Sequence, residues 1–181
     1  MSRFDDAIQE RLSALRREFD SAFSERPRPT QAQEVDLLAV RVAGQPLAVR
    51  LSQVSGIVRD RRIVGLPSTA ADLLGLCGIR GTLVPVFSLA GVLGRATDTA
   101  LPRWCLLCGV AAGVALAFEE FEGYLRVPAL ALTPVEGASA EGRHVMEMAR
   151  LEPVARPVIS LDSILQDLRS RAAPDRAARG E

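Results

Sequence analysis

The 181-residue sequence contains no lysine, a single histidine and only three cysteines. Arginine therefore supplies all 22 basic residues, and 22 acidic residues balance them to a formal net charge of zero. Without a net charge, the chain has no global field that would attract nucleic acid or an anionic membrane surface. Three cysteines indicate a reducing compartment and do not suggest a disulfide framework.

Aromatic residues make up only 4% of the chain, and no apolar run approaches the roughly 20 residues of a membrane-spanning helix. The first residues, Met1–Asp6, are acidic and periodic, unlike a signal peptide. Nucleic-acid binding typically uses several aromatics interleaved with basic residues on one face, whereas Trp104 and Tyr124 are single aromatics in a chain of balanced charge. We therefore expect a cytoplasmic protein that binds no nucleic acid and does not insert directly into a membrane.

The rest of the composition, 48% hydrophobic and 24% charged, is typical of a soluble globular protein. We expect an N-terminal amphipathic helix and proline-rich linker over residues 1–34, a folded domain over 35–172 and a disordered tail over 173–181. The helix carries one apolar stripe, formed by Phe4, Ile8, Leu12, Leu15, Phe19 and Phe23. Two interpretations of this stripe stay open: it packs on its own domain, or it docks a further partner or a second copy.

The folded domain begins with strand signals. Apolar and polar residues alternate between 35 and 51, which predicts a half-buried hairpin, and Val54–Val58 continues as a third strand. Residues 70–74 predict a short helical turn. Gly75–Gly81 then reads as a glycine-punctuated turn that leads into an apolar strand, Leu83–Phe87.

Part of this pattern recurs later in the chain. The matching segments are 47–49 with 114–116 and 56–59 with 123–126, both at an offset of 67, and 85–93 with 157–165 at an offset of 72. The second copy is therefore five residues longer than the first. Ser88 and Ser160 occupy matching positions, and each is predicted to cap a helix. A repeat of this length indicates a duplicated small β unit, hence small barrels or a sandwich.

Candidate catalytic groups are few. Cys105 and Cys108 have C-x-x-C spacing but lie in a strand pattern, where residues three apart point to opposite faces. We interpret them as core residues, because a redox or metal site needs a helix N-terminus or further ligands. His144 has no Cys or Ser beside it in the sequence and is predicted to lie on the surface. Glu120 and Glu122 are predicted to share an exposed, solvated face.

The glycines at 75, 78 and 81 match neither the dinucleotide-binding nor the P-loop spacing, and they precede a strand rather than a helix. No catalytic set, metal site or cofactor site is therefore predicted. We expect a protein that is not an enzyme.

A series of linked motifs resembles the CheW-like domain family of bacterial chemosensory adaptors. The matching segments are Gly44–Leu51, Val54–Ile57, Pro67, Gly75–Leu89, Phe118–Leu125 and Val158–Leu165. Together they span about residues 35–168. The resemblance implies a mainly β fold of two pseudo-repeated, five-stranded SH3-like barrels that share a core, with a C-terminal helix in addition to the N-terminal one.

The resemblance also implies a function. A CheW-like protein is a non-enzymatic scaffold that couples the signalling tip of methyl-accepting chemoreceptors to the regulatory domain of a CheA-type histidine kinase. It would be recruited to membrane-associated receptor arrays, and a groove between the barrels would hold the receptor's helical tip. By motif position, the receptor- or kinase-binding residues are Val54, Gly56, Ile57, Ile79, Arg80, Val84, Val86, Trp104 and Cys105.

Three positions depart from the family pattern: Gly56, Gly78 and Ser88 stand where its motifs have Glu, Asn and Asp. Arg80 matches the family arginine but has lost the carboxylate at position 56 as a partner. Two interpretations of Arg80 stay open: it satisfies turn carbonyls, or it is kept for an acceptor on another protein. The departures also leave an alternative function, a divergent CheW-like interaction module in a polar-localisation or array-assembly protein.

Overall fold

In a computed structural model, the described residues are 33–96, 102–109, 113–135, 142–151 and 154–172. The chain divides into two compact units, Met1–Gln33 and Glu34–Glu181, and all the helices and strands described below belong to the second. The predicted N-terminal helix, its linker and the C-terminal tail lie outside the described residues.

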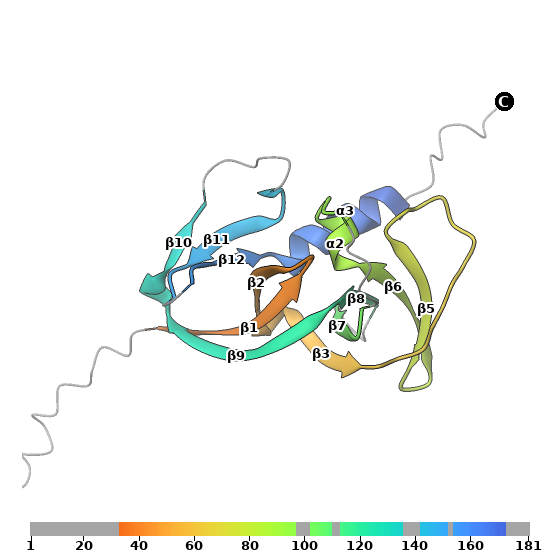
Figure 1. Cartoon of the computed structure of the whole chain (residues 1–181), viewed down its shortest axis with the longest axis horizontal. Helices are drawn as coiled ribbons and strands as arrows, with labels where there is room; N and C mark the ends of the chain where they lie inside the picture. Colours follow the sequence, from red (N-terminus) through yellow and green to blue (C-terminus); the bar gives the residue numbers. More distant parts are fainter. Residues whose placement is uncertain (1–32, 97–101, 110–112, 136–141, 152–153, 173–181) are drawn as a thin grey trace, which may run out of the picture. The chain divides into compact units, whose positions relative to one another are not determined.

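The second unit is mainly β (Figure 1). Its strands are β1 (Glu34–Val42), β2 (Gln45–Arg50), β3 (Val54–Arg59), β4 (Ile63–Val64), β5 (Leu73–Ile79), β6 (Thr82–Ser88), β7 (Trp104–Cys108), β8 (Val114–Phe118), β9 (Glu120–Pro128), β10 (Leu132–Pro134), β11 (Val145–Ala149) and β12 (Arg156–Ile159). Its helices are η1 (Leu51–Gln53), α2 (Leu89–Val92), η2 (Ala129–Ala131) and α3 (Leu161–Ala172).

The strands form two six-stranded sheets with matching orders. Sheet A runs β10-β11-β12-β2-β1-β9, and sheet B runs β4-β5-β6-β8-β7-β3. Each has one strand more than the five expected, because a strand of two or three residues, β4 or β10, pairs at one end. Figure 1 shows the two sheets next to each other, with β9 and β3 near their junction. The predicted fold, mainly β with two related SH3-like units, is confirmed.

The two sheets are built by exchange of strands between the sequence repeats. Within repeat one, β1 and β2 belong to sheet A, while β3 to β6 belong to sheet B; repeat two does the reverse. The equivalence extends to single residues. Val158 pairs in parallel with Ala48 on sheet A, and Val86 pairs with Ala115 on sheet B, as the two sequence offsets require. The duplication predicted from sequence is therefore a structural one.

Three hydrophobic clusters fill this arrangement, and β1 contributes to two of them. Leu38 and Val40 face the central cluster between the sheets, whereas Leu37 faces the interior of sheet A. In β7, likewise, Cys105 faces the interior of sheet B and Cys108 faces the central cluster, on opposite faces as predicted. The first hairpin is thus buried on both faces in its middle, not half-buried as expected from its alternating pattern.

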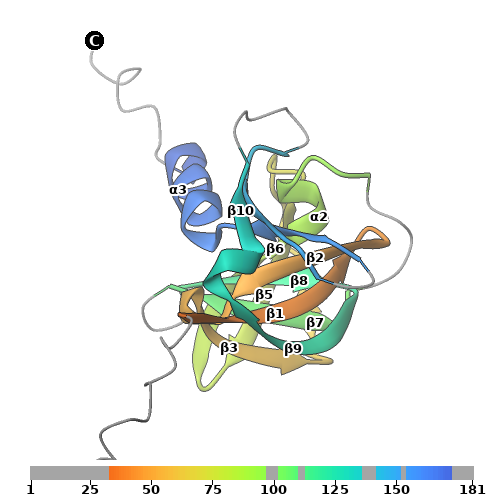
Figure 2. The same ribbon diagram turned by 90° about the vertical axis from the view of Figure 1, so that its left-hand side faces the viewer.

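Both repeats end in a capped helix that covers the central cluster. Ser88 Oγ accepts a hydrogen bond from Gly91 N at 3.2 Å, and Ser160 Oγ accepts one from Ser163 N at 3.2 Å. These bonds satisfy backbone donors of the first turn. The apolar side of α3, including Ile164 and Leu168, packs into the central cluster. Figure 2, turned by 90° from Figure 1, again draws α2 and α3 towards the upper side of the strands.

The region before β6 differs from the sequence prediction. The predicted turn over residues 70–74 is present but short: Leu73 N donates a hydrogen bond to Ala70 O at 3.2 Å. It does not extend into a helix, because Leu73 already begins β5, which continues through the glycines to Ile79. The turn into β6 is formed by Arg80 and Gly81 alone, with φ of 50° and 82°. Two consecutive left-handed residues suit the tight hairpin that joins twisted strands. Glycine spacing was misleading here, because Gly75 serves close strand packing rather than a turn.

Gly75 is required by the approach of β4. Its φ is 140°, and a Cβ at this position would lie 2.0 Å from the carbonyl oxygen of Val64. Gly78, in the same strand, has nothing within 4 Å of such a Cβ. We expect Gly75→Ala to lower the free energy of unfolding by about 3–5 kcal/mol, because it combines a backbone clash with an unfavourable φ. Gly78→Ala is the matched control and should change it by less than about 1 kcal/mol. Chemical denaturation measures both, and equal effects would contradict the close approach of β4.

Candidate functional site

The junction between the sheets places part of the predicted site at the surface. On β3, Val54 and Ile57 are half-buried and pack against the central cluster, while Val58 faces the interior of sheet B. Residues three apart in a regular strand point to opposite faces. A bulge between Val54 and Gly56, where Ser55 is not paired with a residue of β7 in the strand register, restores Val54 and Ile57 to one side. This side forms an apolar rim where the sheets meet.

Trp104 extends the rim from β7. Its ring centroid lies 5.5 Å from that of Phe121 on β9, so the pair joins sheet B to sheet A. The guanidinium of Arg59 lies 5.1 Å from the centre of the Trp104 ring, within the range of a cation–π contact. Asp60 then bridges Arg59 and Arg103, with distances of 3.1 Å to the Nε atom of each. A hydrogen bond from Arg103 lowers the pKa of the exposed Asp60 carboxyl.

Four predicted site residues are buried rather than displayed. Ile79, Val84, Val86 and Cys105 are each at most 4% exposed, and all four belong to the cluster inside sheet B. They pack beneath the surface residues of sheet B, and in this structure they cannot contact a partner directly. The motif resemblance identified them because the strands themselves belong to the family pattern, and alternate residues of a strand face inward.

Gly56 is packed against the neighbouring strand. A Cβ at this position would lie 3.3 Å from Cδ1 of Leu107 on β7. A larger side chain here therefore requires Leu107 to move. The position where the family motif has a glutamate is thus adapted to glycine in this chain.

Arg80 stands at the tip of the β5–β6 hairpin and is exposed. Among the described residues its guanidinium makes no ion pair, and it donates no side-chain hydrogen bond to the turn carbonyls. The structure therefore does not show the first interpretation, in which Arg80 satisfies the carbonyls of its own turn. The guanidinium is always protonated, so it faces water or an acceptor supplied from outside.

The prediction for His144 is wrong, because the side chain is 1% exposed. Its Nδ1 lies 2.9 Å from Oγ of Ser163 on α3, and its Nε2 lies 3.7 Å from Asp167 Oδ2. A serine nineteen residues away in sequence left no local signal. The ring is shielded from solvent, and its contact with Ser163 links the start of β11 to α3. Burial lowers the pKa of His144, and this effect is opposed by the charge of Asp167.

The acidic run also differs from its prediction. Glu120 is exposed, but the Glu122 side chain is only 16% exposed and lies between Arg41 of β1 and Arg156 of β12. Glu122 falls at a bulge between the residues of β9 that pair with Ala39 and Val40, so its side chain departs from strict alternation. The two ion pairs of Glu122 therefore connect three strands of sheet A, β1, β9 and β12.

The described cysteines show no reactive environment. All three are buried and free, and burial raises the pKa of Cys105 to about 11 and that of Cys108 to about 12. Thiols are nucleophiles and metal ligands as thiolates, which these surroundings disfavour. In the described part of the chain, no cluster of three or more His, Cys, Asp or Glu residues is placed to hold a metal ion. None of the described helices is long and apolar enough to cross a membrane.

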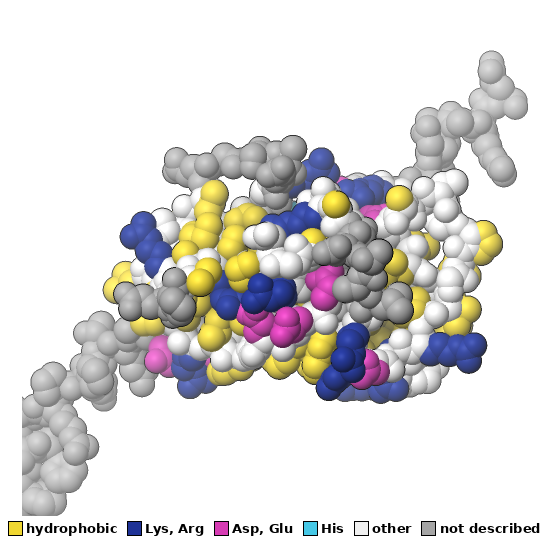
Figure 3. Space-filling view, viewed as in Figure 1, with side chains coloured by type: hydrophobic (Ala, Val, Ile, Leu, Met, Phe, Trp, Pro, Cys, Tyr) yellow, Lys and Arg dark blue, Asp and Glu magenta, His cyan; other side chains and the backbone are white. Residues whose placement is uncertain are grey.

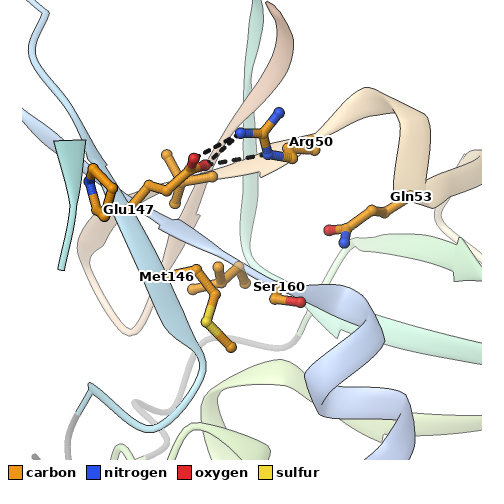
Figure 4. Close-up of a pocket in the computed structure, with 8 residues that line it drawn as sticks. Arg50, Gln53, Met146, Glu147 and Ser160 are labelled. Carbon is orange, nitrogen blue, oxygen red and sulfur yellow. Dashed lines mark hydrogen bonds and ion pairs between the residues drawn. The ribbon is translucent and has the colours of Figure 1, made fainter. Parts of the chain in front are cut away.

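A pocket of ≈ 290 Å³ opens on sheet A (Figure 4). Its polar groups are already engaged: Arg50 Nη2 lies 2.8 and 2.6 Å from the two carboxylate oxygens of Glu147. Gln53 accepts a hydrogen bond from Leu161 N at 3.1 Å and donates one to Asp162 at 2.7 Å. Met146 and Ser160 complete the opening seen in Figure 4. The charged groups of this pocket, Arg50 and Glu147, are thus paired with each other.

Two strand-exchanged barrels around a shared core, with an apolar rim at their junction, define a class of β domain. The match to the CheW-like domain model covers residues 36–169, and the chain belongs to this family. The family is one of scaffold and adaptor domains. The resemblance drawn from the motifs is confirmed.

Two similar proteins extend the comparison. Protein FrzA of Myxococcus xanthus is 27% identical over 158 residues, which cover 84% of this chain and 96% of FrzA. The crystal structure of the scaffolding protein TtCheW from Thermoanaerobacter tengcongensis superimposes with a TM-score of 0.63 at 16% identity. That match covers 70% of this chain and 89% of TtCheW, and it shows that the fold is shared.

The burial of His144 predicts a pH dependence of stability. Its pKa is lowered in the folded protein, so the unfolded chain binds a proton more readily below about pH 6.5. The free energy of unfolding should therefore fall between pH 7.5 and 5, by at most about 1.4 kcal/mol per pH unit for one group. His144→Gln should flatten this dependence, measured by urea denaturation at several pH values. Unchanged slopes in the variant would contradict a buried neutral histidine.

Proposed function

We propose that this protein is a non-enzymatic adaptor that joins the cytoplasmic signalling tip of chemoreceptors to the regulatory domain of a CheA-type histidine kinase. Membership of the CheW-like family carries the proposal. The similarity to FrzA and to the scaffolding protein TtCheW supports it. The receptors would bring the protein to membrane-associated arrays.

The apolar rim is the part of the surface best suited to a helical partner. Val54, Ile57 and Trp104 are half-buried and lie where the two sheets meet. An amphipathic helix would place its apolar side against them, which is the helix-in-groove mode of recognition. Half-buried aromatic and aliphatic side chains are typical of such contacts, because docking removes their remaining surface from water.

Arg80 would add a charged contact with one of the two partners. It is held at a hairpin tip and uses no acceptor among the described residues, so pairing with a partner's carboxylate would break no internal bond. A charge-assisted hydrogen bond is stronger than a neutral one and fixes orientation. The kinase domain is itself CheW-like in this family, so a contact between barrels is the expected arrangement.

A second candidate is a divergent CheW-like module in a polar-localisation or assembly protein. It is favoured by Gly56, whose close packing on Leu107 leaves no room for the family's carboxylate without rearrangement. Deletion of residues 1–30 separates the two candidates. A coupling protein should keep receptor and kinase binding after this deletion, whereas loss of all partner binding would favour the assembly role of the N-terminal segment.

Co-purification with a receptor signalling tip and with the kinase regulatory domain tests the proposal. Arg80→Glu should weaken binding to one of them, with a change in unfolding free energy within about 1 kcal/mol, because the residue is exposed. Arg150→Glu is the matched control. Arg150 is also exposed, but it follows β11 of sheet A, whereas Arg80 lies in sheet B's hairpin. A folded wild-type protein that binds neither partner would rule out the coupling function.

A further inference from the structure

The outer face of sheet B carries an apolar strip that the fold leaves open. Val64 of β4, Leu76 of β5 and Pro85 of β6 are paired in one row across three strands. Leu83, two residues before Pro85 on the same face, is 69% exposed, and Val64 is 57% exposed. Large apolar side chains exposed side by side mark an interaction surface more often than single ones do.

The strip is open at Leu83 because the residue opposite Leu83 on β5 is a glycine. Leu83 pairs with Gly78, and nothing lies within 4 Å of the place that a Cβ of Gly78 would occupy. Further along the same face of β6, Phe87 packs against the central cluster. The outer face of β6 thus passes from a packed end at the junction to an uncovered end at the hairpin tip. Nothing in the packing of the barrel requires leucine at position 83.

Three arginines surround the uncovered end. Ile63 pairs with Cys77, so Arg61 and Arg62, which precede Ile63, lead towards the end of β5 that carries Arg80. All three are exposed, and none forms an ion pair within the described part of the chain. In Figure 3, basic side chains gather along the lower right of the molecule, where Figure 1 draws the end of β3 and the tip of β5 and β6.

Two nearby arginines, unlike these three, do form ion pairs. Arg59 and Arg103 are both held by Asp60, as described above. Near the centre of the view in Figure 3, acidic and basic side chains lie next to each other. The hairpin end is therefore a local excess of positive charge on a chain whose total charge is zero. Positive charge without internal partners beside exposed leucine and valine complements a ligand that is both acidic and apolar.

We propose that the outer face of β4–β5–β6, with Leu83 and Val64 at its centre and Arg61, Arg62 and Arg80 at its end, binds an acidic amphipathic helix of a partner protein. This inference rests on the proposed adaptor function, because it states which chemistry one of the partners must present. The apolar side of the helix covers Leu83 and Val64, and its carboxylates meet the arginines. The absent side chain at Gly78 lets the helix approach closely.

An acidic protein segment fits this surface better than a nucleic acid. No aromatic side chain lies among the residues of the strip and its arginines, so bases have nothing on which to stack. A phosphate backbone would use the three arginines but would leave Leu83 and Val64 exposed. The apolar strip therefore decides between these two anionic ligands.

Two synthetic helical peptides of about 18 residues test the inference; they share a leucine side and carry either glutamates or lysines elsewhere. The purified full-length protein should bind the glutamate peptide and not the lysine peptide, measured by fluorescence anisotropy. Affinity should fall as salt rises, because exposed charge pairs are screened. Replacing Arg61, Arg62 and Arg80 together by Glu should weaken binding at least about tenfold, at roughly 2–5-fold for each arginine. Leu83→Gln should also weaken it, whereas Arg150→Glu should not.

Three outcomes would overturn the inference: equal affinity for both peptides, an unchanged affinity in the triple variant and in Leu83→Gln, or tighter binding to duplex DNA or phosphatidylserine vesicles. The experiments also distinguish failure of this binding surface from failure of the adaptor function. If the triple variant and Leu83→Gln still co-purify with receptor tip and kinase domain as the wild type does, this surface is wrong and the adaptor function stands. If the wild type binds the glutamate peptide but neither partner, the adaptor function is wrong and the surface stands.

Discussion

The parallel pairing of β2 with β12 and of β6 with β8 is the constraint on which the rest of this structure depends. Each of these pairs joins a strand of one sequence repeat to a strand of the other. Hydrogen bonds along these pairs close each sheet across the repeat boundary, so neither repeat holds a complete sheet of its own. The junction with its rim of Val54, Ile57 and Trp104 exists because both sheets are built in this interlocked way.

In β8 the two faces differ in side-chain size. Ala115 and Ala117 face the interior of sheet B, and Leu116 and Phe118 face the central cluster. Aromatic side chains gather at the junction, where Trp104 meets Phe121. Small barrels have little interior room, and the wider space lies between them. A chain with few aromatic residues suits this plan.

The opposite faces of Cys105 and Cys108 and the caps at Ser88 and Ser160 were predictable, because each depends on residues close in the chain. The duplication was predictable for another reason: matching segments recur at offsets of 67 and 72 residues, which the sequence shows directly. The sequence did not predict the exchange of strands, since offsets between repeats do not say which strands pair. His144 and Glu122 were misplaced for a related reason: their partners lie on elements distant in sequence, and a bulge changes the side that Glu122 faces. Among the predicted site residues, the motif could not separate the half-buried Val54 and Ile57 from the inward Val84 and Val86, because that depends on the register and the bulge of β3.

The order of strands along the chain also has a consequence for synthesis. Sheet B uses a continuous stretch, β3 to β8, whereas sheet A needs β1 and β2 together with β9 to β12. A chain leaving the ribosome can therefore complete sheet B while the last strands of sheet A are still to be made. Until β12 emerges, the first hairpin has a hydrogen-bonding edge at β2 without its parallel partner, and unpaired edges favour aggregation. The earliest residues of the domain are thus among the last to be fully paired, and the nascent chain is most exposed to mispairing at its own beginning.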